Sequence, residues 1–280
     1  MSESLPARGT ADWTLIGVDF TSAPRRRKPI TAAIGRLQGD VLVLEGVEAL
    51  PDWPAFEALL ARPGPWLGGF DFPFGLPREA IVDLGWPQDW PALVRHCAGL
   101  GRDGFRAALD AYRESRPIGR RYAHRATDLP ARSHSPLKLV NPPVGLMFLE
   151  GAPRLLAGGV TIAGIIDADP QRVAVEAYPG LLARSITTAP YKSDDRAKQT
   201  AARRDSRAHI VRALQAANEP ARPALAVPDM LLAQLIDDAA GDHLDAALAL
   251  AQAAIALRAG APNFGLPDEV DTLEGWIAGA

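Results

Sequence analysis

Five acidic residues follow or flank short apolar stretches, a setting in which an ionised carboxylate needs a compensating positive charge. They are Asp19 in "IGVDFTSA", Asp71 in "GGFDFPFG", Glu176 in "VAVEAYPG", and Asp242 and Asp245 in "GDHLDAALAL". Carboxylates that are brought together repel one another unless a cation lies between them, and Mg²⁺ and Mn²⁺ prefer such oxygen ligands. The pattern therefore predicts that these five residues bind Mg²⁺ or Mn²⁺. Two such ions about 3.5–4 Å apart would activate a water molecule and stabilise the leaving oxygen in phosphodiester cleavage.

Each of these acids also has an ordinary structural interpretation. Asp19 could bond the amides of the turn that follows it, and Asp71 could cap a turn in the same way. Glu176 could pair with a nearby arginine. Asp242 stands where a helix N-cap is expected, and Asp245 would then lie in the first turn, which favours acids. Residues three apart share a helix face, so Asp242 and Asp245 could also reach one metal ion.

The first part of the chain predicts strands that would bring Asp19 and Asp71 together. "DWTLIGVDFTSA" (12–23) is an apolar, β-branched strand ending at Asp19, and residues 28–50 form two more strands around the "QGD" turn at 38–40. A helix over 52–62 then leads to a fourth strand at 64–73, which the helical connection makes parallel to the first. Asp19 and Asp71 would both lie at carboxyl ends of parallel strands, where open α/β sheets place ligands.

The rest of the chain predicts a helical and loop insertion, further strands and a helical end. Residues 77–158 form the insertion, with helices at about 78–84, 90–98 and 102–115 and an apolar stretch at 144–159. Strands follow at 161–166 and 172–179, then a polar helix or helix pair at 193–215 and two helices at 229–260 split at Gly241. The order predicts an α/β fold of ribonuclease H-like type, with an antiparallel three-stranded meander, added parallel strands and helices on both faces. We expect a flexible tail (1–12), one domain (13–262) and a C-terminal extension (263–280).

Composition limits the class of protein. The 280 residues carry a formal charge of −3, which argues against a surface coated in nucleic-acid-binding charge. The single Cys97 excludes an internal disulfide framework and a cysteine-rich zinc module, so a reducing cytoplasm is the expected location. The first residues lack the apolar core of a signal peptide, and the longest apolar stretch is alanine-rich, as in a buried helix rather than a membrane span.

Four segments together resemble a known family. The strand "GVDFTSAP", the strand "FDFPFGLP", the segment "VAVEAYPGLLA" followed by "YKSDDRA", and the helix "GDHLDAALALAQAAIAL" are similar to the domain-of-unknown-function 429 family, whose members are described as predicted nucleases of ribonuclease H-like fold. The resemblance runs from about residue 14 to 260 and is weakest in the insertion at 85–160. It implies that Asp19, Asp71 and Asp245 match the family's acidic positions, with Glu176 and Asp242 as further candidates.

Two basic segments, in which the chain departs from the family, could hold phosphates beside the acids. One is "RRRK" (25–28) after the first strand, and the other is 112–138, with seven basic residues against two acidic ones and interleaved tyrosines and histidines. Aromatic and basic side chains in this mixture are typical of nucleic-acid binding. The candidate contacts are Arg25, Arg26, Arg27, Lys28, Arg120, Arg121 and Arg125. A solvated loop, or one docked on the protein's own acids, would have the same composition.

These observations favour a Mg²⁺- or Mn²⁺-dependent nuclease acting on DNA or RNA, with the oligomeric state left open. Asp19, Asp71 and Asp245 would bridge the metal ions, and Glu176 would position metal or water. Lys192 could contact the scissile phosphate or complete an ion pair near Glu176. One alternative is a nucleotide-dependent phosphotransferase or ATPase of the actin and sugar-kinase type, although "GVDFTSAPRRRK" lacks the second glycine that such a phosphate loop prefers. The other is a non-catalytic binding protein on the same fold.

Overall fold

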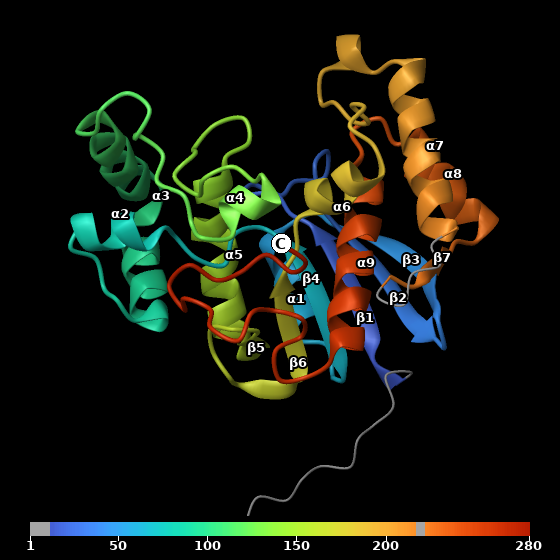
Figure 1. The fold of residues 1–280 in the computed structure, drawn as a ribbon, viewed down its shortest axis with the longest axis horizontal. Helices are drawn as coiled ribbons and strands as arrows, with labels where there is room; N and C mark the ends of the chain where they lie inside the picture. Colours follow the sequence, from blue (N-terminus) through green and yellow to red (C-terminus); the bar gives the residue numbers. More distant parts are fainter. Residues whose placement is uncertain (1–11, 217–221) are drawn as a thin grey trace, which may run out of the picture.

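The computed structural model describes residues 12–216 and 222–280, so the predicted tail lies outside the described residues except for Asp12. In the described part, seven strands form one mixed sheet in the order β5-β6-β4-β1-β2-β3-β7 (Figure 1). The strands are β1 (Thr14–Asp19), β2 (Ile30–Gln38), β3 (Val41–Leu50), β4 (Trp66–Asp71), β5 (Val160–Ile162), β6 (Asp169–Glu176) and β7 (Ala224–Ala226). β1, β2 and β3 pair antiparallel, and the other pairs are parallel. The predicted sheet is confirmed.

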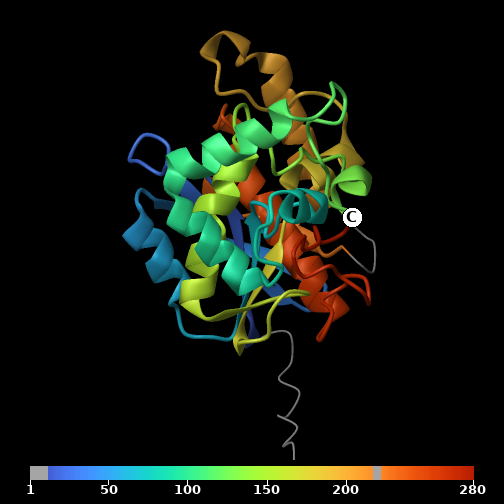
Figure 2. The ribbon, with the colours of Figure 1, turned by 90° about the vertical axis from the view of Figure 1, so that its left-hand side faces the viewer.

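Helices cover both faces of this sheet, as the sequence predicts. They are α1 (Trp53–Leu60), α2 (Arg78–Asp83), α3 (Trp90–Glu114), α4 (Asp128–Ala131), α5 (Val144–Gly158), α6 (Pro179–Ile186), α7 (Ala201–Gln215), α8 (Asp229–Asp237) and α9 (Asp242–Ala259). Side chains of α1, α2, α3 and α5 form one buried cluster with one sheet face, and those of α6 to α9 form a second cluster with the other. Figure 2 shows the two layers edge-on, with α1, α3 and α5 on one side and α9 on the other.

Helix α9 lies directly on the backbone of the two central parallel strands. A Cβ atom added to Gly17 of β1 would lie 2.1 Å from the backbone nitrogen of Leu250, and one added to Gly69 of β4 would lie 2.6 Å from the carbonyl oxygen of Ala249. Only glycine leaves room for a helix backbone this close. The alanine-rich α9 is buried along most of its length, which confirms the prediction of a buried helix rather than a membrane span. The close contact fixes where α9 begins relative to the strand ends.

Differences from the predicted elements have local causes. The two helices predicted at 90–98 and 102–115 are the two segments of α3, which Gly101 separates with a non-helical φ of +64°. The strand predicted at 161–166 ends at Ile162, because Gly164 (φ +75°) turns the chain back so that Ile162 bridges Ile166. Helix α6 and strand β7 were not predicted. Within the described residues, no helix is long and apolar enough to span a membrane.

The predicted C-terminal extension is an integral part of the packing. Leu273 is fully buried and Ile277 is 2% exposed. Ile277 forms a parallel bridge with Glu176 at the end of β6, and the backbone NH of Leu76 donates to the carbonyl of Leu273 at 3.0 Å. Residues 271–280 therefore cover the end of β6 and the turn after β4, next to the predicted site.

Candidate functional site

The two strand-end aspartates lie side by side at the carboxyl edge of the sheet. Asp19 is the last residue of β1 and Asp71 the last of β4, and the two are direct partners in the parallel register. Residues paired in this way point to the same face, and residues two apart on one strand also share a face. Because Gly17 and Gly69 face α9, the side chains of Asp19 and Asp71 emerge on the α9 side of the sheet. The flanking Phe70 is fully buried on the opposite face.

The first turn of α9 adds two more acids to this edge. Asp242 is the first residue of the helix, and Asp245, three residues later, is fully buried. The hydroxyl of Tyr191 donates to Oδ1 of Asp245 at 2.7 Å, and the ammonium of Lys192 is in close contact with Oδ2 of the same carboxylate. Asp242 instead accepts a bond of 3.3 Å from Lys28. Each helix acid is therefore paired with one lysine.

The cluster stores electrostatic repulsion. Burial raises the pKa of Asp71 to about 7, and the negative charges of Asp245 and Glu176 act in the same direction. Burial, followed by the charge of Asp245, also raises the pKa of Asp19 well above its usual range. Lys192 opposes both shifts. Although burial acts to lower the pKa of Lys192, the charge of Asp245 raises it well above its ordinary value.

Lys192 supplies the positive charge where the sequence predicts a metal ion. As the side chains are placed, no three His, Cys, Asp or Glu residues in the described part of the chain converge closely enough to hold one metal ion. The donors themselves suit a hard divalent cation, since Asp19, Asp71 and Asp245 offer only carboxylate oxygens and repel one another. The three carboxylates thus match a divalent cation in donor type and in charge, but not in their present positions. For these oxygens to converge on an ion, the Lys192 ammonium must move off Asp245.

Glu176 lies on the other face of the sheet, because its register partner on β4 is Phe70 rather than Asp71. Its two carboxylate oxygens accept bonds of 2.7 and 2.8 Å from the Arg125 guanidinium, and a third bond of 2.8 Å comes from the backbone NH of Phe74. Both side chains are almost fully buried, at 3% and 2% exposed. Glu176 therefore forms an ion pair with Arg125, as its alternative interpretation expected. This corrects its predicted role as a metal ligand beside Asp19 and Asp71.

The same pair corrects the role predicted for Arg125. Its guanidinium also donates to Oδ1 of Asp128 at 2.9 Å and to the carbonyl of Glu274 at 2.9 Å, so its charge is neutralised within the protein. The other predicted phosphate contacts lie on the surface. Five of them are exposed, namely Arg25, Arg26, Arg27, Arg120 and Arg121. Lys28 is half-buried, and it pairs with Asp194 at 2.7 Å as well as with Asp242.

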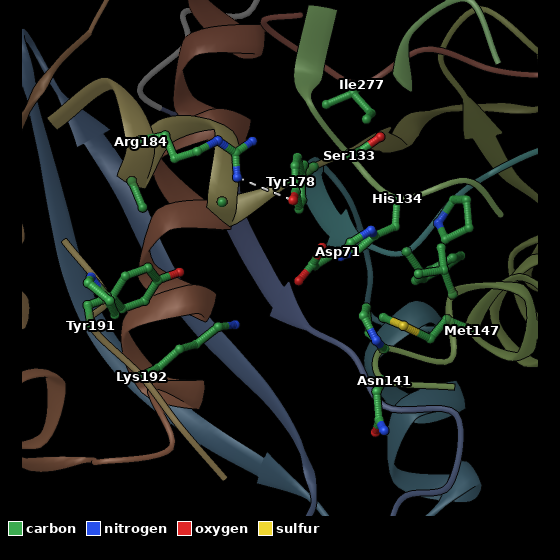
Figure 3. Close-up of a pocket in the computed structure, with 18 of the residues that line it drawn as sticks. Asp71, Ser133, His134, Asn141, Met147, Tyr178, Arg184, Tyr191, Lys192 and Ile277 are labelled. Carbon is green, nitrogen blue, oxygen red and sulfur yellow. Dashed lines mark hydrogen bonds between the residues drawn. The ribbon is translucent and has the colours of Figure 1, made fainter. Parts of the chain in front are cut away.

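Two adjoining cavities meet at Asp71 and Lys192. The larger has a volume of about 720 Å³ and the smaller about 370 Å³. Both are lined by Asp71, Pro142, Pro143, Met147, Lys192 and Asp194. Asp19, Lys28 and Asp242 line only the smaller one. In Figure 3, Asp71 lies near the centre of the larger cavity, with Lys192 and Tyr191 on one side and His134 and Met147 on the other.

Apart from Asp71, Arg125, Glu176 and Lys192, the residues of the larger cavity were not predicted from the sequence. Tyr178 and Arg184 come from α6 and the residue before it, Tyr191 from the loop after α6, and His134 from the insertion. Tyr191 directly precedes Lys192, which the sequence predicts to be a site residue, so Tyr191 could have been predicted to lie near the acids. The approach of the insertion to α6 depends on tertiary packing, which leaves no local pattern.

Comparisons with known proteins give no relative on which to base a function. No protein-family model matches the chain, and searches of curated proteins and of solved structures found no match. The resemblance to the domain-of-unknown-function 429 family stays a prediction.

Proposed function

We propose that this protein is a Mg²⁺- or Mn²⁺-dependent hydrolase of phosphodiester bonds in nucleic acid. The observation that carries the proposal is the pairing of Asp19 with Asp71 in adjacent parallel strands, with the buried Asp245 on the helix that covers them. Three carboxylates gathered at the carboxyl edge of a sheet are costly for stability. Such an arrangement is typical of a site whose function requires the charge.

In this function, Asp19, Asp71 and Asp245 would hold the metal ions, with Asp242 at the edge of the site. The bound ions would supply an activated water molecule and stabilise the leaving oxygen. Lys192 has two roles. It neutralises Asp245 before substrate binds, and once displaced it can pair with a phosphate oxygen of the substrate.

Nucleic acid is the favoured substrate because exposed basic side chains follow Asp19 in the chain. Arg25, Arg26 and Arg27 are exposed in the loop that follows Asp19. The two cavities share Asp71 and Lys192 in their linings, so nucleotides next to the cleaved bond could occupy both. Phosphate contacts of this kind position a nucleic acid without reading its sequence.

The test is cleavage of labelled single-stranded, duplex, branched and DNA–RNA hybrid substrates with Mg²⁺ or Mn²⁺. We expect metal-dependent cleavage of at least one substrate, and its loss in Asp19→Asn, Asp71→Asn and Asp245→Asn. Asp40→Asn is the matched control, because Asp40 is 89% exposed at the opposite edge of the sheet. Four intact substrates would refute the proposal, and an active Asp19→Asn variant would refute the site.

A thermal-shift measurement separates this function from the phosphotransferase alternative. Mn²⁺ alone should raise the melting temperature of a nuclease of this type, whereas ATP with Mg²⁺ should add nothing further. A clear additional shift with ATP would favour the phosphotransferase. A protein that neither ion nor nucleotide stabilises, and that cleaves nothing, would fit the non-catalytic binding protein.

A further inference from the structure

The larger cavity carries two guanidinium groups whose charge no carboxylate neutralises. Arg184 donates to the carbonyl of Ala131 at 2.6 Å and to the hydroxyl of Tyr178 at 3.3 Å, and Arg203 donates to the carbonyl of Lys192. Within the described residues, neither arginine forms an ion pair with an acid. The cavity therefore presents positive charge to whatever enters it, and it suits an anion.

The acids of the same cavity do not cancel this charge. Glu176 is neutralised by Arg125, and Asp194 pairs with Lys28 at 2.7 Å. Burial raises the pKa of Asp71 to about 7, and the positive charge of Lys192 opposes this shift. The guanidinium groups of Arg184 and Arg203 thus line the same cavity as Asp71.

The remaining walls suit a flat, largely apolar group. Met147, Pro143 and Ile277 line the cavity, together with the ring of Tyr178, over which the Arg184 guanidinium lies at 5.0 Å. Figure 3 shows Tyr178, Ile277, Met147 and His134 around one space, with Asp71 beside it. Aromatic rings and arginine planes are the surfaces on which nucleobases stack. A volume of about 720 Å³ is in the range of sites that enclose one small ligand.

We infer that the larger cavity is a subsite for one unpaired nucleotide next to the cleaved phosphate. Its base packs between Tyr178 and Met147, and Arg184 and Arg203 hold the adjoining phosphates. The inference rests on the proposed function, and it names the substrate class: a single strand, or a duplex whose strands part at the cleaved position. A paired base must leave the stack before it can pack in this cavity.

Binding without metal tests the subsite separately from the chemistry. The probes are a labelled single-stranded oligonucleotide, the blunt duplex of the same sequence, and that duplex with an overhang, each titrated with protein in EDTA. Thr188→Trp fills the cavity from an exposed position in its lining. Ser185→Trp is the matched control, since Ser185 is also exposed, lies on α6 and is not part of the lining.

We expect the unmodified protein to bind the single strand and the overhang more tightly than the blunt duplex. Thr188→Trp should weaken binding of the first two probes about tenfold or more, which is the scale of one lost stacking contact, while Ser185→Trp changes nothing. Equal binding by the two tryptophan variants, or tighter binding of the blunt duplex, would overturn the subsite. Cleavage with Mn²⁺ is measured in parallel. Selective binding of the single strand without cleavage would support the subsite and contradict the hydrolase. Cleavage of the duplex that Thr188→Trp leaves unchanged would support the hydrolase and contradict the subsite.

A second pair of variants probes the base contact itself. Tyr178→Phe keeps the ring and loses only the hydroxyl, so it should bind the single strand as the unmodified protein does. Tyr178→Leu removes the stacking surface and should weaken binding about tenfold. If both variants bind alike and both are folded by circular dichroism, the base does not stack on Tyr178 and the inference is wrong.

Discussion

Asp19 and Asp71 are direct register partners at the ends of two adjacent parallel strands, under a helix that covers both. This relationship makes two carboxyl groups leave the same face of the sheet next to each other. The nearby Asp245 adds a third, and burial together with these charges raises the pKa of both strand-end acids. The protein therefore loses stability when these groups ionise, and this loss can be measured.

Asp71→Asn should stabilise the metal-free protein at high pH. The ordinary pKa of the group is 3.8 and its pKa in the folded protein is about 7, so the folded state binds the proton more tightly. The free energy of unfolding therefore falls as the pH rises through this range, and the full loss persists above it. The neutral amide avoids a cost on the order of a few kcal/mol. Thermal melts in EDTA should show a higher melting temperature for the variant at about pH 8 and little difference at about pH 4.

Asp40→Asn controls for the loss of a carboxylate as such, because Asp40 is exposed at the far edge of the sheet. Its melting temperature should follow that of the unmodified protein at both pH values. If Asp71→Asn melts lower than the unmodified protein at high pH, Asp71 is a stabilising turn cap rather than a member of a repelling cluster.

Lys192→Gln should weaken the metal-free protein and strengthen its response to metal. The variant removes the positive charge that neutralises the fully buried Asp245, so the melting temperature in EDTA should fall. Without the competing ammonium, Mn²⁺ should bind more tightly and give a larger increase in melting temperature. Lys198→Gln, at a lysine that is 66% exposed, should behave like the unmodified protein. Equal Mn²⁺ shifts in all three proteins would mean that Lys192 does not occupy the place of a metal.

The positions of Asp19, Asp71 and Asp245 in the fold could be predicted from the sequence because their signals are local. Asp19 and Asp71 each end an apolar strand, and the helix between those strands makes them parallel, so their meeting follows from connectivity. Asp245 follows from a buried alanine-rich helix that begins at Asp242.

Glu176 was misplaced because its face depends on register, which local pattern does not give. A shift of one residue along β6 exchanges the two faces of a strand. "VAVEAYP" is apolar on both faces, so alternation could not reveal that Glu176 pairs with Phe70. The arginine that neutralises it lies 51 positions earlier in the chain, in a loop without regular structure. Helix α6 was not predicted because the strand expected at 172–179 was extended as far as Pro179. Pro179 is in fact the first residue of the helix.

Arg125→Met should destabilise the protein strongly. The substitution leaves two acids, Glu176 and Asp128, buried without their positive partner, which costs about 3–5 kcal/mol for a buried pair. Denaturant unfolding measures this loss. The double variant Arg125→Met with Glu176→Gln should recover part of it, because one of the two uncompensated charges is gone. Arg204→Gln breaks an exposed pair with Asp237 and should cost less than about 1 kcal/mol. An Arg125→Met variant as stable as Arg204→Gln would contradict the buried network.

Gly17→Ala should reduce both stability and activity, because it separates α9 from the sheet. The new methyl group would lie 2.1 Å from the backbone nitrogen of Leu250, so the helix must move. Overpacking of this kind costs about 1–3 kcal/mol or more. The movement also carries Asp245 away from Asp19, so metal-dependent cleavage should fall further than the loss of folded protein explains. Gly46→Ala on β3, where a methyl group meets nothing within 4 Å, is the matched control and should leave both unchanged. Stability is measured by denaturant unfolding, and cleavage rates are compared at equal concentrations of folded protein. Unaltered cleavage in Gly17→Ala would mean that the position of α9 does not govern the site.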